Sequence, residues 1–256
     1  MTAIPELKAF LIMCPLVLLA GFVDAIGGGG GLISLPAYLL AGLPPHNAIA
    51  TNKLSSACGT GLTVFRFARQ GLIRWRLALP SMAAGLLGSW CGARLSLLVD
   101  SAVLEKVLYV VLPVSAVLVL RKDALKDDRE AMTEFPGRRT ALVAAAAALV
   151  LGVYDGFYGP GTGTFLIIAF SLLARMDVRS ANGQCKAVNL TTNVTSLIVF
   201  LRSGQTVILL GLAAAVCNMA GNWLGSGLAI KAGSRITRPI ILFVLLLLLL
   251  RILGVY

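Results

Sequence analysis

Charged residues are scarce in this 256-residue sequence, where Asp, Glu, Lys and Arg together make up 13%. An ordinary soluble domain carries about 25%. The chain is also 58% hydrophobic, with a mean hydropathy of +0.89. This much apolar side-chain mass does not fit inside a water-soluble core, and it excludes a disordered chain. The composition therefore predicts an all-α polytopic membrane protein, because about 20 apolar residues make one helical crossing.

Other absences narrow the chemistry. The five cysteines form no CxxC pair or Cys/His cluster, so neither a disulfide framework nor a metal site is predicted. Neither GxxxxGK[ST] nor a complete GxGxxG is present, so no nucleotide loop and no cofactor is expected. The single histidine, His46, follows two prolines, and we expect it to be an exposed loop residue. The net charge is +11, but the cations lie in short loops between apolar runs, which indicates topology signals and no nucleic-acid partner.

Apolar runs divide the chain into two halves of five segments. The second run of each half is too short for a full crossing, and it follows a glycine-rich break. We expect a first transmembrane repeat over 1–120, a charged cytoplasmic linker over 121–139 and a second repeat over 140–256. The runs cover 7–26, 32–43, 47–69, 75–99 and 103–120, then 140–158, 163–174, 180–202, 206–230 and 236–254.

The second half repeats the first. A shift of 133 residues lays Lys53 on Lys186, and a shift of 131 lays Asp24 on Asp155. Since each half has five segments, an odd number, the second repeat is expected to be inverted. With both termini outside, 15 of the 22 Lys and Arg fall on the cytoplasmic side and five on the outer side, as the positive-inside rule requires. Inverted repeats with broken helices are typical of secondary transporters that bind substrate near the bilayer midplane.

The two glycine-rich breaks, 27–31 and 159–163, are the first candidate site. Glycine lets the backbone approach a ligand, and the helix that follows each break begins with free N–H groups and a positive dipole end that favour an anion. The alternative is that the glycines only permit a tight turn and close packing. We expect each break to form the tip at which a long helix turns back into a short one. The candidate substrate-binding residues at these two tips are Gly28, Gly29, Gly30, Gly161, Thr162, Gly163 and Thr164.

Two lysines form the second candidate site. Lys53 and Lys186 lie six or seven residues inside predicted helices, about 10 Å deep, where an ammonium needs a partner or water. A bound anion would supply that partner; the alternatives are a side chain that extends to the surface or an ion pair with Asp24 or Asp155. These aspartates either pair with the lysines or take up protons during transport, and pairing is favoured because it relieves both burial costs. The candidate substrate-binding residues here are Thr51, Asn52, Lys53, Gln184, Lys186 and Asn189.

Two small-residue motifs predict close helix crossings. Gly88 and Gly92 form one GxxxG motif, and Gly221 and Gly225 form its equivalent in the second half. Glycines at this spacing let two helix backbones approach closely. Each motif encloses a tryptophan, so these crossings are read as structural.

These motifs resemble the TauE/SafE family of membrane permeases, the sulfite-exporter-like group. The resemblance lies in Gly21–Leu32 followed by Ala48–Lys53, and in a diverged copy, Gly152–Gly163 followed by Cys185–Asn189. It covers essentially the whole chain. It implies a bacterial-type inner-membrane permease for small anions such as sulfite, sulfonates and other organosulfur or carboxylate compounds.

We therefore expect a multi-pass transporter that exports small oxyanions by alternating access, with H⁺ or Na⁺ as the coupling ion, and not an enzyme. A cation or metal permease stays open, because two aspartates and Cys185 lie near the expected site. An intramembrane lipid-phosphate enzyme is a further alternative. It would need clustered carboxylates or a histidine-supported nucleophile.

Overall fold

The computed structural model describes residues 7–100, 137–233, 235–237, 239–240 and 243. Within these residues every regular element is a helix, so the prediction of an all-α chain is confirmed. The labelled helices are α1 (Leu7–Gly27), α2 (Gly31–Leu40), α3 (Pro45–Arg69), α4 (Trp75–Leu98), α6 (Arg138–Phe157), α7 (Thr162–Leu172), α8 (Val178–Arg202) and α9 (Ile208–Ala232).

The predicted runs match these helices within a few residues. The run 103–120 and linker residues 121–136 lie outside the described residues, and the run 236–254 is described only at scattered positions. Gly137 begins the second described stretch and precedes α6, so Arg138 and Arg139 at the end of the predicted linker form the first turn of a helix.

One local prediction was wrong. His46 is not an exposed loop residue: it is half-buried in the first turn of α3, where its Nε2 lies 3.0 Å from the carbonyl oxygen of Ser96. The helix begins at Pro45 because proline at the first helical position needs no hydrogen-bond donor. The two prolines therefore start a helix here instead of lengthening the loop.

Each glycine-rich break separates a long helix from a short one. α2 has 10 residues and α7 has 11, so each is about 15–17 Å long and reaches only halfway through a bilayer core of about 30 Å. The backbone reverses in the left-handed region, at Gly28 (φ +74°) and Gly29 (φ +78°) in the first break and at Gly159 (φ +99°) and Gly161 (φ +85°) in the second. Side chains with a Cβ rarely adopt this conformation, which explains why both breaks are rich in glycine.

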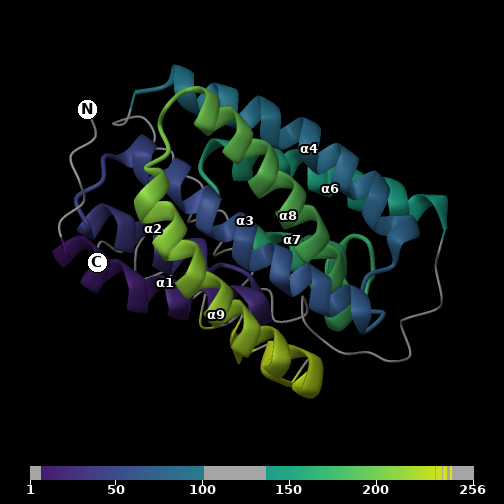
Figure 1. Cartoon of the computed structure of the whole chain (residues 1–256). Helices are drawn as coiled ribbons and strands as arrows, with labels where there is room; N and C mark the ends of the chain where they lie inside the picture. The colour runs from purple at the N-terminus through teal and green to yellow at the C-terminus, as the bar shows by residue number, and fades with distance from the viewer. Residues whose placement is uncertain (1–6, 101–136, 234, 238, 241–242, 244–256) are drawn as a thin grey trace.

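Each GxxxG motif lies at a close crossing of two helices, one from each half of the chain. A Cβ on Gly88 would lie 2.9 Å from the backbone nitrogen of Val153 in α6, and one on Gly221 would lie 2.8 Å from that of Phe22 in α1. Figure 1 shows α4 beside α6 along one side of the bundle and α1 with α9 along the other. α3 and α8 lie between these two pairs and therefore form the centre of the molecule.

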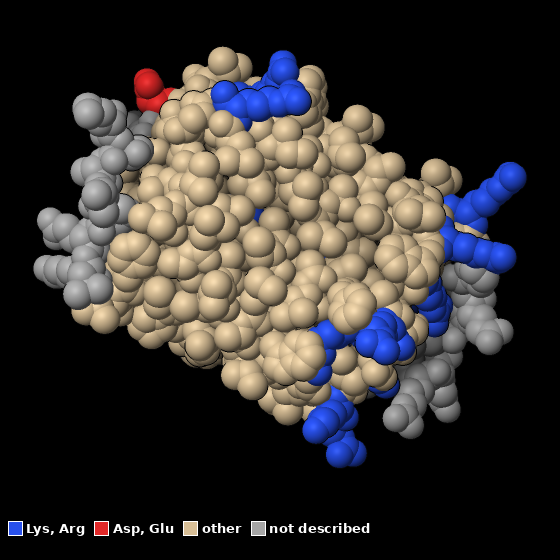
Figure 2. All heavy atoms as spheres, in the orientation of Figure 1, with Lys and Arg blue, Asp and Glu red and all other residues tan. Residues whose placement is uncertain are grey.

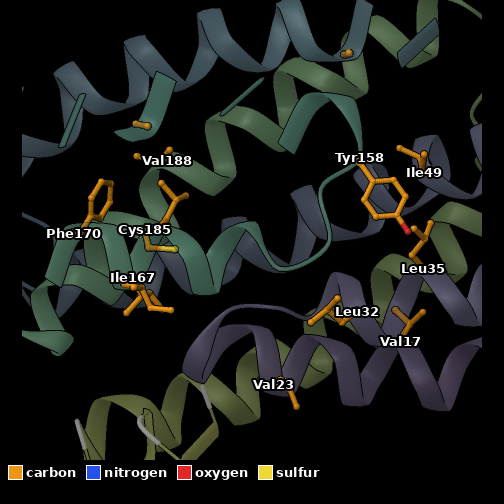
Figure 3. Packing of buried hydrophobic residues seen from close by; sticks show 14 of the residues in the cluster. Val17, Val23, Leu32, Leu35, Ile49, Tyr158, Ile167, Phe170, Cys185 and Val188 are labelled. Atoms are coloured by element: carbon orange, nitrogen blue, oxygen red, sulfur yellow. The ribbon is translucent and has the colours of Figure 1, made fainter. Parts of the chain in front are cut away.

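The apolar core lies where the short helices meet this centre. Figure 3 shows Leu32 and Leu35 of α2 with Ile49 of α3, and Ile167 and Phe170 of α7 near Val188 of α8. The outer surface is also apolar: large side chains such as Leu87, Leu149 and Val216 are exposed. Within the described residues, α1, α6 and α9 are long and apolar enough to cross a membrane.

Positive charge gathers at one end of the bundle. Gly183 in α8 lies against the backbone of Leu72 in the α3–α4 turn, and Arg179 donates to the Ile230 carbonyl oxygen of α9, so these helix ends share one side. Figure 2 shows most of the blue side chains at that end. Among the described side chains, the opposite end carries Arg94 and Arg202. The cations at the rich end are Arg66, Arg69, Arg74, Arg76, Arg138, Arg139, Arg175, Arg179, Lys231 and Arg235.

Candidate functional site

The two glycine breaks touch each other at the centre of the molecule. A Cβ on Gly28 would lie 2.8 Å from the Cα of Gly163, and a Cβ on Gly163 would lie 2.9 Å from the Cα of Gly28. The Thr164 hydroxyl donates to the Gly27 carbonyl oxygen at 2.9 Å. The N-terminal ends of α2 and α7, one from each half, therefore meet at one place.

Two ion pairs flank this contact, and each joins one half of the chain to the other. Lys53 Nζ of α3 lies 2.8 Å from Asp155 Oδ2 of α6, and their side chains are 2% and 6% exposed. Lys186 Nζ of α8 lies 2.9 Å from Asp24 Oδ2 of α1, with exposures of 0% and 19%. The pairs thus satisfy four ionisable groups that are costly to bury alone.

The Asp24 carboxylate also closes the first break. Its Oδ1 accepts a hydrogen bond from the Gly30 backbone nitrogen at 3.4 Å, at the start of α2, where a negative charge is favoured by the helix dipole. Lys186 Nζ donates both to Oδ2 and to the main-chain oxygen of the same aspartate. Asp24 is therefore held at several points, as part of the tip itself.

A cavity of about 30 Å³ lies between the tips and α3, α8 and α9. Its walls combine glycine backbone with hydroxyl, amide and charged side chains, so it suits a small polar ligand. The lining residues are Asp24, Gly29, Gly30, Gly31, Ser34, Asn52, Lys53, Ser56, Thr60, Asp155, Gly159, Gly161, Thr162, Gly163, Asn189, Asn193 and Asn218.

Most of the predicted site residues meet at this cavity. Lys53 and Asn52 reach it from α3, and Asn189 reaches it from α8 with its Oδ1 unpartnered among the described residues. The predicted residues that line it are Gly29, Gly30, Asn52, Lys53, Gly161, Thr162, Gly163, Asn189, Asp24 and Asp155.

Five predicted residues do not line it. Gly28 and Thr164 form the contact between the tips. Lys186 donates to Asp24, which itself lines the cavity. Thr51 Oγ1 accepts a hydrogen bond from the Val207 backbone nitrogen at 3.1 Å. Gln184 is 1% exposed, and its side-chain amide has no hydrogen-bond partner among the described residues.

Sequence reasoning missed several lining residues. Thr60 lies seven residues after Lys53, two helical turns along the same face, and this spacing was a usable signal. Ser34 donates to Asn52 Oδ1 at 2.7 Å, one turn into α2. Asn218 comes from α9, and no sequence signal connected that helix with the tips. It belongs to a buried network in which Asn222 donates to Asn218 Oδ1 at 2.7 Å.

The family model described as sulfite exporter TauE/SafE matches residues 13–252. The chain belongs to the TauE/SafE family. The matched range includes both glycine breaks and both ion pairs, and the resemblance noted in the sequence is thereby confirmed.

Relatives of this TauE/SafE chain carry transporter names. The probable membrane transporter protein ORF9 of Sinorhizobium sp is 34% identical over 97% of this chain and 93% of its own length. The probable membrane transporter protein YfcA of Escherichia coli (strain K12) is 33% identical, over 89% and 83%. The probable membrane transporter protein YdhB of Bacillus subtilis (strain 168) is 25% identical, over 84% and 87%. No solved structure matches the chain.

These similarities fix the broad function. The chain is a TauE/SafE membrane transporter and not an enzyme, so the alternative of an intramembrane lipid-phosphate enzyme is set aside.

Proposed function

We propose that this transporter carries small anions, of the sulfite or sulfonate type, through the cavity between the two glycine breaks. The observation that carries the proposal is the position of Lys53, a buried ammonium that lines a cavity beside the N-terminal ends of α2 and α7. Both the ammonium and the helix dipoles favour negative charge at that place. Outward movement accords with the description of the family as exporters.

The size of the cavity favours the smallest members of this class. A volume of about 30 Å³ has room for roughly two water molecules, at about 10–15 Å³ for each. We expect an oxyanion such as sulfite to displace the walls less than a longer sulfonate does, so the sulfonate should bind more weakly to this form of the protein.

We also propose that the halves are inverted repeats that alternate access to the cavity. Matched contacts support this: Thr63 donates to Asn222 Oδ1 at 2.7 Å, and a shift of 133 residues turns this pair into Ser196 and Ser89, whose hydroxyls lie 2.6 Å apart. Transporters of this kind rock one repeat against the other around a fixed site.

The gathering of cations supports the proposed orientation in a bacterial inner membrane. Short loops on the cytoplasmic side carry an excess of Lys and Arg, so we assign the cation-rich end to the cytoplasm and both chain termini to the outside. The lipid bilayer contacts the exposed apolar side chains, and H⁺ or Na⁺ accompanies the substrate.

A cation or metal permease is the second candidate, because Asp24 and Asp155 line the cavity. Each of these carboxylates is already paired with a lysine, which leaves less negative charge for a cation. Within the described residues no group of three His, Cys, Asp or Glu side chains converges.

The test is a thermal-shift screen of the purified protein with sulfite, sulfate, methanesulfonate and a divalent metal, followed by uptake into proteoliposomes. A ligand that binds the folded state raises the unfolding temperature. We expect the small oxyanions to do so and the metal not to. Lys53→Ala is expected to abolish both the shift and the uptake, and Arg94→Ala, at an exposed cation outside the cavity, is the matched control. Stabilisation by the metal alone, or unchanged uptake by Lys53→Ala, would contradict the proposal.

A further inference from the structure

The two ion pairs are chemically alike but face the cavity differently. Lys186 is fully buried, donates to two oxygens of Asp24 and does not line the cavity. Lys53 lines the cavity, and its ion-pair partner among the described residues is Asp155 alone. A ligand in the cavity can therefore reach the Lys53 ammonium without disturbing the tip that Lys186 holds.

Among the described residues, the charges around the cavity already cancel. Lys53 and Lys186 contribute two positive charges, and Asp24 and Asp155 contribute two negative ones. A singly charged anion that entered alone would leave one uncompensated negative charge in a buried site. An uncompensated charge is strongly unfavourable there, so the anion needs a positive charge to enter with it.

We propose that the anion enters together with one proton, which binds Asp155 and releases Lys53 to pair with the anion. This inference rests on the proposed function. The carboxylate gains the proton and becomes a neutral acid. The ammonium keeps its charge and exchanges its carboxylate partner for the anion. The net charge of the site is zero before and after, and the proton and the anion move in the same direction.

Asp155 is the proton acceptor because each of the other described ionisable groups near it is already engaged. Asp24 lines the cavity from α1 as well, but its Oδ1 accepts a hydrogen bond from Gly30 and its Oδ2 is paired with Lys186, which does not line the cavity. Cys185 on α8 is fully buried, and its thiol donates to the Gly163 carbonyl oxygen. Tyr154 in α6 and Tyr158, the residue directly after that helix, both have partners. Among the described residues, α4 and α7 contribute no charged group to the cavity.

The experiment counts protons directly. Methanesulfonate stays a monoanion across the neutral range, so any proton taken up on binding belongs to the protein. Titration calorimetry in two buffers with different ionisation heats should give one proton taken up per anion bound. The dissociation constant should rise with pH, by up to about tenfold per pH unit, because a proton and a ligand that bind together are linked.

Two variants locate the acceptor. Asp155→Asn leaves the Lys53 charge free for the anion, so binding should take up no proton and its dissociation constant should not change with pH. Asp100→Asn, at an exposed position after α4, should behave as the wild type does.

Three results would overturn the inference. Wild-type binding without proton uptake, whether or not it needs sodium, refutes proton coupling while leaving anion transport in place. One proton per anion in Asp155→Asn refutes the assignment to this carboxylate. No binding of any tested anion at any pH removes the proposed function, and the inference falls with it. The number of protons that the wild type takes up per anion tests proton coupling even if Asp155→Asn does not fold.

Discussion

Replacing Gly28 by alanine tests the contact between the two glycine breaks. Gly28 has φ +74°, and an alanine in that left-handed conformation costs about 1–2 kcal/mol. Its Cβ would also lie 2.8 Å from the Cα of Gly163 and closer still to the carbonyl carbon of that residue and the nitrogen of Thr164. These are backbone atoms of the opposite tip, and overpacking of this kind costs about 1–3 kcal/mol more. The expected loss of unfolding free energy is about 2–5 kcal/mol.

Gly204→Ala is the matched control. Gly204 has φ +72°, and no atom of the described residues lies within 4 Å of the position its Cβ would occupy. It therefore suffers only the conformational cost, about 1–2 kcal/mol. Thermal unfolding in detergent measures the difference, which at about 2–4 °C per kcal/mol amounts to roughly 2–12 °C. Equal unfolding temperatures for Gly28→Ala and Gly204→Ala would refute the contact between the tips.

Two further variants address the second ion pair and the orientation. Lys186→Met leaves the Asp24 carboxylate without its partner and should destabilise the protein by about 3–5 kcal/mol, an effect that Lys186→Met with Asp24→Asn should partly reverse. A single variant as stable as Arg202→Met, an exposed control, would show that the pair is dispensable. In a cysteine-free background, a membrane-impermeant maleimide should label Gly204→Cys and not Gly71→Cys in intact cells. The reverse pattern would invert the proposed orientation.

The boundaries of the helices were predictable because each apolar run ends at glycine, proline or a polar, charged stretch. The run 75–99 corresponds to Trp75–Leu98, and the run 180–202 corresponds to Val178–Arg202. The neighbours of each helix were not predictable. The motif at Gly88 and Gly92 requires a close backbone partner, but its spacing says nothing about which helix supplies it. That partner is α6, from the other half of the chain.

The residue types of the candidate site were predictable from the sequence, but the contacts between these residues were not. The repeat aligned Lys53 with Lys186 and Asp24 with Asp155, which identifies equivalent positions and not contacts. Each ion pair joins one half to the other. Which lysine meets which aspartate depends on how α3 and α8 pack against the two glycine breaks. Asn218 was missed for the same reason, since it reaches the cavity from a helix with no glycine break.

Each ion pair joins a residue of the first half to a residue of the second, and this has a consequence for biosynthesis. Lys53 leaves the ribosome 102 residues before Asp155, and Asp24 leaves it 162 residues before Lys186. At about 5–20 residues per second, the first lysine waits about 5–20 s in the nascent chain before its counterion exists. During that time an ammonium at the centre of a helix costs about 2.5–3.5 kcal/mol in the bilayer. Until the second half is made, the N-terminal half therefore carries a lysine without its counterion, which disfavours its insertion as an independent unit.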